Sequence, residues 1–88
     1  MTRFTYEHLL ELVDHDEELI LRLVEEGLVE RRDDVVALDP DAVLLARTLW
    51  RDLDVEWAGI EIILRLVAQL ADARRRVTEL EAGRGGPE

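Results

Sequence analysis

The fold of this chain is decided by residues 53–70, which read LDVEWAGIEIILRLVAQL. Apolar side chains recur in and just after this stretch every three or four positions, the spacing that places them on one face of a helix. This first stripe consists of Trp57, Ile60, Leu64, Val67 and Ala71. We therefore expect a long helix whose first stripe packs on the N-terminal half of the chain.

A second apolar stripe runs beside the first, with the alternating steps of three and four that define a heptad pattern. We call it the C-terminal stripe, and it comprises Ile63, Leu66, Leu70, Ala73, Val77 and Leu80. A small domain offers few partners to a helix beyond Leu70. The stripe therefore predicts a homodimer seam or a contact with another protein, and packing on the chain's own helices is the alternative.

Two short helices are expected near the N-terminus. Apolar residues at helical spacing predict a helix over residues 5–13, and the polar run that follows interrupts it. Asp14 or Asp16 is suited to cap the next helix, residues 17–26. Gly27 can end that helix in a left-handed conformation. Residues 5–27 thus form a predicted helix-turn-helix.

A β-hairpin is expected next, because residues 28–38, LVERRDDVVAL, place a polar turn between two apolar runs. Asp39 then has the position of an N-cap, and Pro40 the first position of a third helix over residues 40–52. A hairpin this short, directly after a helix-turn-helix, corresponds to the wing of a winged-helix domain. The predicted fold is therefore mainly α: a winged helix-turn-helix with a small β-hairpin wing and a long C-terminal helix.

The predicted domain covers residues 1–82 and ends with the long helix. Asp54 is expected to cap that helix, which should span residues 55–80. The glycine-rich residues 83–88 are expected to form a disordered tail.

The composition argues against an enzyme. The 88 residues include no Ser, Cys, Lys or Asn, so the commonest nucleophiles and the Schiff-base amine are missing. No catalytic residue, cofactor or metal site is expected. With no cysteine and no apolar run long enough to cross a bilayer, we expect a cytoplasmic protein without a membrane span.

The charge distribution favours a basic protein partner over nucleic acid. The net charge is −10, and residues 1–30 carry nine carboxylates against two arginines. Carboxylates near a phosphate oppose binding, whereas a DNA-reading helix supplies cations and hydrogen-bond donors.

The order of the expected elements resembles that of the MerR-like winged-helix superfamily. Residues 23–29, LVEEGLV, are similar to the end of its second helix, and residues 39–43, DPDAV, to the start of its third. Residues 53–60, LDVEWAGI, take the place of its "Glsl.eI" segment. The resemblance implies the superfamily's fold.

Trp57, Gly59 and Ile60 narrow the resemblance to the chaperone-modulator family called CbpM, over about residues 4–81. Glu30 stands where that family often has proline. The resemblance implies a protein that binds the J-domain of a DnaJ-like co-chaperone and inhibits it. A MerR-type DNA-binding transcriptional regulator is the alternative, in which Arg22, Arg31 and Arg32 would contact phosphates.

The candidate contacts to a J-domain are mainly acidic. The acidic cluster, as we call it, consists of Asp14, Asp16, Glu17 and Glu18. Each of these acids can alternatively serve as a helix cap or a solvated side chain. Glu61 and Trp57 complete the predicted contact set, and Trp57 is either an interface anchor or a core residue. Trp50 is expected at the domain edge, where Arg47 and Arg51 can stack on it or pair with acids.

Overall fold

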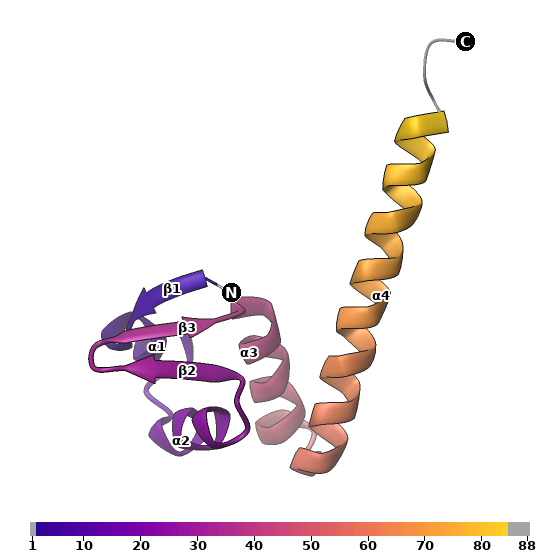
Figure 1. The fold of residues 1–88 in the computed structure, drawn as a ribbon. Helices are drawn as coiled ribbons and strands as arrows, with labels where there is room; N and C mark the ends of the chain where they lie inside the picture. Colours follow the sequence, from indigo (N-terminus) through magenta and orange to yellow (C-terminus); the bar gives the residue numbers. More distant parts are fainter. Residues whose placement is uncertain (1, 85–88) are drawn as a thin grey trace.

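The structure, a computed structural model, describes residues 2–84. It is mainly helical, with a small three-stranded antiparallel sheet and a long C-terminal helix (Figure 1). In chain order the elements are β1 (Thr2–Thr5), α1 (Tyr6–Leu12), α2 (Glu17–Glu25), β2 (Val29–Arg32), β3 (Val35–Leu38), α3 (Pro40–Arg47), the π-helical turn η1 (Thr48–Asp52) and α4 (Trp57–Arg84). The expected mainly helical architecture, the hairpin and the long final helix are confirmed.

A tight turn joins α1 to α2, and a side-chain cap begins each helix. Thr5 accepts a hydrogen bond from the His8 amide at 3.1 Å and begins α1. Asp14 and His15 both take left-handed backbone angles, with φ of 56° and 59°. Of the two acids suited to cap α2, Asp16 does so, because its Oδ1 accepts from the Leu19 amide at 3.1 Å.

The end of α2 confirms the predicted role of Gly27. This residue has φ of 78°, and its amide donates to the Val24 carbonyl at 3.1 Å. The Leu28 amide donates to the Leu23 carbonyl at 2.9 Å. These two bonds form a Schellman motif, which turns the chain from α2 directly into β2.

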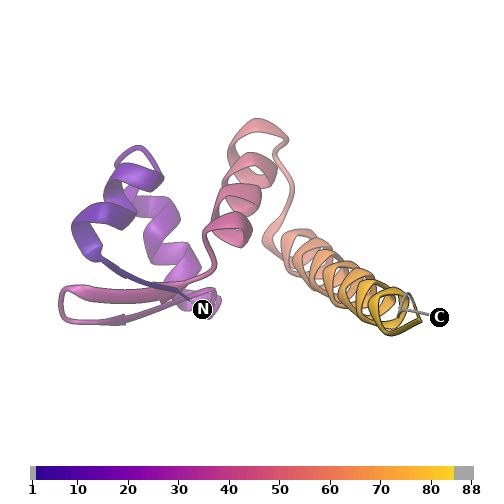
Figure 2. The same ribbon diagram turned by 90° about the horizontal axis from the view of Figure 1, so that it is seen from above.

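The hairpin belongs to a larger sheet than the sequence indicated. Strand β1 was not predicted, yet it pairs with β3, and the strand order is β1-β3-β2. The two-residue hairpin turn places Asp33 at φ of 55°. The helices cover one face of the sheet (Figure 2), and Val29, Val36 and Leu38 are buried on that face.

Helix α3 starts as predicted but ends in an unexpected turn. Asp39 accepts from the Asp41 amide at 3.0 Å, and Pro40 takes the first helical position. The chain then widens into η1, where the Leu53 amide reaches back five residues to the Thr48 carbonyl at 3.1 Å. Such wide turns are rare and reorient the side chains that they carry.

The predicted cap of α4 is wrong. Asp54 lies in the connecting turn with φ of 54°, and α4 begins at Trp57, not at residue 55. The Ile60 amide donates to the Glu56 carbonyl at 2.9 Å, which gives Glu56 the N-cap position. The Val55 amide donates to the Leu49 carbonyl at 2.8 Å instead, which anchors this turn to η1.

The core takes only the first two turns of α4. Trp57, Ile60 and Leu64 are buried as expected. Val67 is 46% exposed and Ala71 is also exposed, so the prediction that the whole first stripe packs on the N-terminal half is wrong for these two residues. The other buried residues are Leu9, Val13, Leu19, Ile20, Leu23, Val29, Val36, Leu38, Val43, Ala46 and Leu49.

The first part of α4 runs beside α3 as far as Ala71, and the C-terminal part of the helix projects from the rest of the molecule (Figure 1). The radius of gyration is 16.2 Å, whereas a compact chain of this length would have about 12 Å. Of the C-terminal stripe, Ile63 packs against the core, and the other members are exposed.

The last helix also extends past its predicted end. Gly83 and Arg84 are helical and do not belong to a tail, while residues 85–88 of the predicted tail lie outside the described residues. Among the described residues, helices that combine the length and the apolar character needed to cross a membrane are absent.

Candidate functional site

The centre of the acidic cluster is engaged within the chain. The guanidinium of Arg51, carried by η1, binds both carboxylate oxygens of Asp16, at 2.8 and 2.9 Å. The same guanidinium donates to Oε1 of Glu18 at 3.0 Å. The hydrogen bond from Arg51 is the main cause that lowers the pKa of Asp16, and burial of the carboxyl group partly opposes it. Asp16 is therefore a structural acid that fastens α2 to η1.

A second arginine approaches the same cluster. Arg47 lies 3.8 Å from a carboxylate oxygen of Asp14, and the Arg51 guanidinium stacks 3.9 Å from the ring centre of Trp50. The expectation that these arginines stack on Trp50 or pair with acids is thus confirmed. Glu17 is exposed at the first turn of α2.

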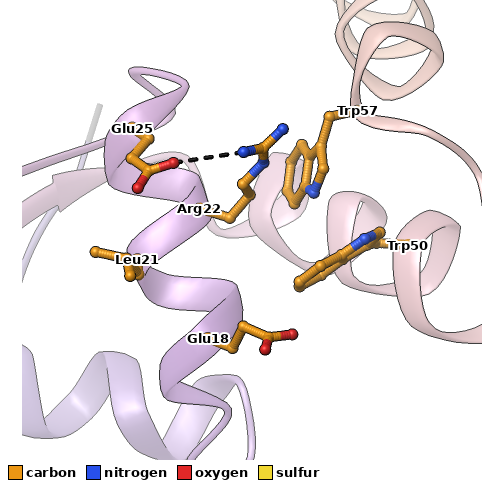
Figure 3. Close-up of a pocket in the computed structure, with 6 residues that line it drawn as sticks. All are labelled: Glu18, Leu21, Arg22, Glu25, Trp50 and Trp57. Carbon is orange, nitrogen blue, oxygen red and sulfur yellow. Dashed lines mark hydrogen bonds and ion pairs between the residues drawn. The ribbon is translucent and has the colours of Figure 1, made fainter.

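A hollow lies between α2 and the corner at which η1 leads into α4 (Figure 3). We call it the α2 hollow. Its volume is about 320 Å³, and it is lined by Glu18, Leu21, Arg22, Glu25, Trp50 and Trp57. The two indole rings lie 5.2 Å apart at an angle of 53° and form one side of it.

Trp57 is both a core residue and a wall of the α2 hollow. Its exposed fraction is only 8%, which confirms the core interpretation. The Arg22 guanidinium lies 5.6 Å from its ring centre. Within residues 2–84, the indole Nε1 of Trp57 and the Nε of Arg22 are buried and have no hydrogen-bond partner.

Glu61 faces a different part of the molecule from the acidic cluster. It lies beside Glu26, at the C-terminal end of α2, where the two residues line a shallow surface depression. Hydrogen bonding with Glu61 raises the pKa of Glu26, and desolvation and the charge of Glu61 act in the same direction. The sequence did not indicate this carboxylate pair, because its members are 35 positions apart.

The three arginines named for DNA contact do not form one surface. Arg22 lies 3.4 Å from Glu25 and 3.5 Å from Glu26 on its own helix. Arg31 stacks 3.9 Å from the ring centre of Tyr6. Arg32 is exposed and, as the next residue along the strand, points to the opposite face of the sheet from Arg31.

The exposed surface of α2 is consequently acidic. The helix carries Glu17, Glu18 and Glu25 exposed on its surface, and its single arginine is engaged by neighbouring carboxylates.

Comparisons of the chain with protein-family models, with curated proteins and with solved structures found no significant match.

Proposed function

We propose that this chain is a chaperone modulator of the CbpM type, built on a MerR-like winged helix-turn-helix. It would bind the J-domain of a DnaJ-like co-chaperone in the cytoplasm and inhibit it through an acidic surface. The fold supports this proposal, because helix pair, hairpin, capped third helix and long final helix follow one another in the expected order.

One observation carries the proposal: α2 occupies the place of a recognition helix but exposes carboxylates. Glu17, Glu18 and Glu25 line its surface, and its Arg22 lies within 3.5 Å of two acids. A helix that reads DNA needs free donors and cations at these positions. Carboxylates suit a basic protein surface, which they orient and attract at long range.

The geometry divides the predicted contact residues by role. Glu17 and Glu18 are the contacts most available to a partner, since Glu18 keeps 72% of its side chain exposed despite its bond to Arg51. Asp16 would act indirectly, by holding α2 in place. Asp14 lies at the edge of the same surface, and Glu61 lies apart from it beside Glu26.

A homodimer through α4 is part of the proposal. Four large members of the C-terminal stripe are more than half exposed: Leu66, Leu70, Val77 and Leu80. A continuous apolar stripe of this kind is typical of a helix that pairs with another helix.

The alternative function is that of a MerR-type DNA-binding transcriptional regulator. The feature that favours it is the hairpin, whose exposed Arg32 lines, together with Arg3, a depression on the open face of the sheet. The acidic surface of α2 opposes it.

The proposed function can be tested by isothermal titration of the purified chain with a J-domain at 50 and 300 mM salt. We expect binding that weakens at the higher salt, because exposed charge pairs are screened. The double variant Glu17→Lys and Glu25→Lys should bind at least ten times more weakly. The matched control, Glu79→Lys and Glu81→Lys in the projecting part of α4, should leave the affinity unchanged.

Two results would contradict the proposal. One is the absence of heat and of any mobility change with the J-domain at low salt. The other is a shift of promoter DNA by the unmodified chain at 150 mM salt that the Arg32→Ala variant loses.

A further inference from the structure

The α2 hollow has the features of a binding site and not only those of a packing defect. Its walls come from three separate elements, α2, η1 and α4, and Figure 3 shows Arg22 and both tryptophans converging on it. Trp50 and Trp57 give it an aromatic side, and Leu21, with 61% of its surface exposed, gives it an aliphatic edge. Such a combination of aromatic and aliphatic surface is depleted from solvent-facing positions and enriched at contact sites.

A second, independent observation is a pair of buried donors without acceptors. The indole N–H of Trp57 belongs to a side chain that is only 8% exposed, and the Arg22 Nε is buried beside it. Neither group has a partner within residues 2–84. Buried N–H groups are nearly always hydrogen-bonded in folded proteins, so these two orphaned donors mark the packing between Arg22 and Trp57 beside the hollow as incompletely satisfied.

The charges select the kind of occupant. Glu18 and Glu25 stand at the rim with 72% and 53% of their side chains exposed, which attracts cations and repels a free anion. A cation is nevertheless a poor occupant of the hollow itself, since Arg22 and Arg51 already lie against the rings of Trp57 and Trp50. The interior therefore fits an uncharged apolar group, and the rim fits basic groups around it.

We propose that the α2 hollow is the anchor site for one large aliphatic or aromatic side chain presented by a basic helix of the protein partner. Flanking Arg or Lys side chains of the partner would meet Glu18 and Glu25 at the rim. A volume of about 320 Å³ accommodates a side chain with part of its backbone and is small for a cofactor. The inference rests on the proposed function for the identity of the partner, while the site itself rests on the hollow.

The chain provides its own reporter for this site, because its two tryptophans both line the hollow. The experiment titrates the intact chain with a tryptophan-free J-domain and follows intrinsic fluorescence and heat together. Occupation should shift the emission maximum to shorter wavelength and reduce quenching by acrylamide. The shift should saturate at the same stoichiometry as the heat.

Two variants change the walls of the α2 hollow, one at its exposed edge and one at the buried Trp57. Leu21→Glu places a charge on an exposed edge of the hollow and should weaken binding at least tenfold. Trp57→Phe keeps an aromatic ring but shortens the aromatic wall of the hollow, and should weaken binding three- to tenfold. The matched control is Val35→Glu, at a half-exposed position on the open face of the sheet, which should bind as the unmodified chain does. Circular dichroism verifies that each variant is folded.

The outcomes separate this inference from the proposed function. If the unmodified chain binds the J-domain and Leu21→Glu binds equally well with the same emission shift, the anchor site is overturned and the chaperone function stands. If the J-domain fails to bind but a basic amphipathic helical peptide produces the emission shift, and Leu21→Glu abolishes it, the anchor site stands and the proposed partner is wrong. If neither probe changes the emission, the anchor site is overturned.

Discussion

Asp16 combines two tasks in one side chain. Its Oδ1 caps α2 through the Leu19 amide, and both of its oxygens accept from Arg51. The substitution Asp16→Ala removes both interactions and should lower the unfolding free energy by about 1 kcal/mol through the lost cap alone. Asp16→Asn retains the cap and should cost less. Urea unfolding followed by circular dichroism measures both, and equal losses would contradict the cap assignment.

The same residue makes stability depend on pH. Arg51 lowers the pKa of Asp16 in the folded chain, so the folded state releases this proton more readily than the unfolded state. The stabilisation is present above the unfolded value of about 3.9 and is lost as the pH falls through the lower folded pKa. Asp16→Asn should flatten the stability profile in this acidic window.

Glu26 shows the opposite linkage. Hydrogen bonding with Glu61 raises its pKa, so the folded state holds the proton more tightly than the unfolded state does. Stability therefore decreases as the pH rises through the unfolded value toward the raised folded pKa. Glu61→Gln should raise the melting temperature at pH 7 and have little effect at pH 4. Glu79→Gln, distant on α4, is the control and should show no such pH-dependent difference.

A side chain at Gly27 should destabilise the turn after α2, because this residue has a left-handed backbone conformation. Its φ of 78° is unfavourable for residues with a Cβ, although no atom lies within 4 Å of where that Cβ would sit. Gly27→Ala should therefore destabilise by roughly 1 kcal/mol through backbone strain alone. Gly83→Ala, inside α4 with equal space around it, should be neutral or stabilising. A neutral Gly27→Ala would contradict the left-handed turn.

At the scale of elements, short sequence signals predicted the helices and the hairpin, whose structure is determined by neighbouring residues. Caps such as Asp39 and the stop at Gly27 act within a few residues, so the helices and the hairpin could be placed from sequence alone. Strand β1 could not, because Thr2–Thr5 is short and acquires its structure from hydrogen bonds with β3, thirty or more positions away. The π-helical turn left no recognisable sequence pattern.

The candidate site could not be predicted completely, because it depends on contacts between residues that are far apart in the sequence. The acidic cluster was visible, but the pairing of Asp16 with Arg51 spans 35 positions and forms only when η1 lies beside α2. The α2 hollow needed the same arrangement. Periodicity also overestimated burial, since Val67 continues the apolar stripe of α4 but only lines an open depression beside α3 and stays 46% exposed.

The exposed C-terminal stripe of α4 leads to a testable prediction about the oligomeric state. If its exposed stripe pairs with a second copy, the unmodified chain should sediment as a dimer at micromolar concentration. The double variant Leu70→Glu and Val77→Glu should sediment as a monomer with an unchanged core, because neither residue is buried within the chain. Analytical ultracentrifugation distinguishes these states, and a monomeric unmodified chain would contradict the seam.

At the scale of the whole molecule, the chain is a small domain with a protruding rod, measuring 54 × 28 × 19 Å overall. The α2 hollow belongs to the domain, at the N-terminal end of α4, and the C-terminal stripe lies mostly on the rod. The proposed partner binding and the proposed dimerisation would therefore use separate surfaces, and both surfaces could be occupied at once.

The projection of α4 also has a consequence for limited proteolysis. Arg74, Arg75 and Arg76 lie on the projecting part of α4, C-terminal to the last buried residue of the helix, Leu64. In a monomer this part of α4 opens without disturbing the core, so trypsin should cut there first and leave a folded N-terminal fragment. In a dimer the paired helices would open together with their interface. The rate of that first cut should then fall as the protein concentration rises.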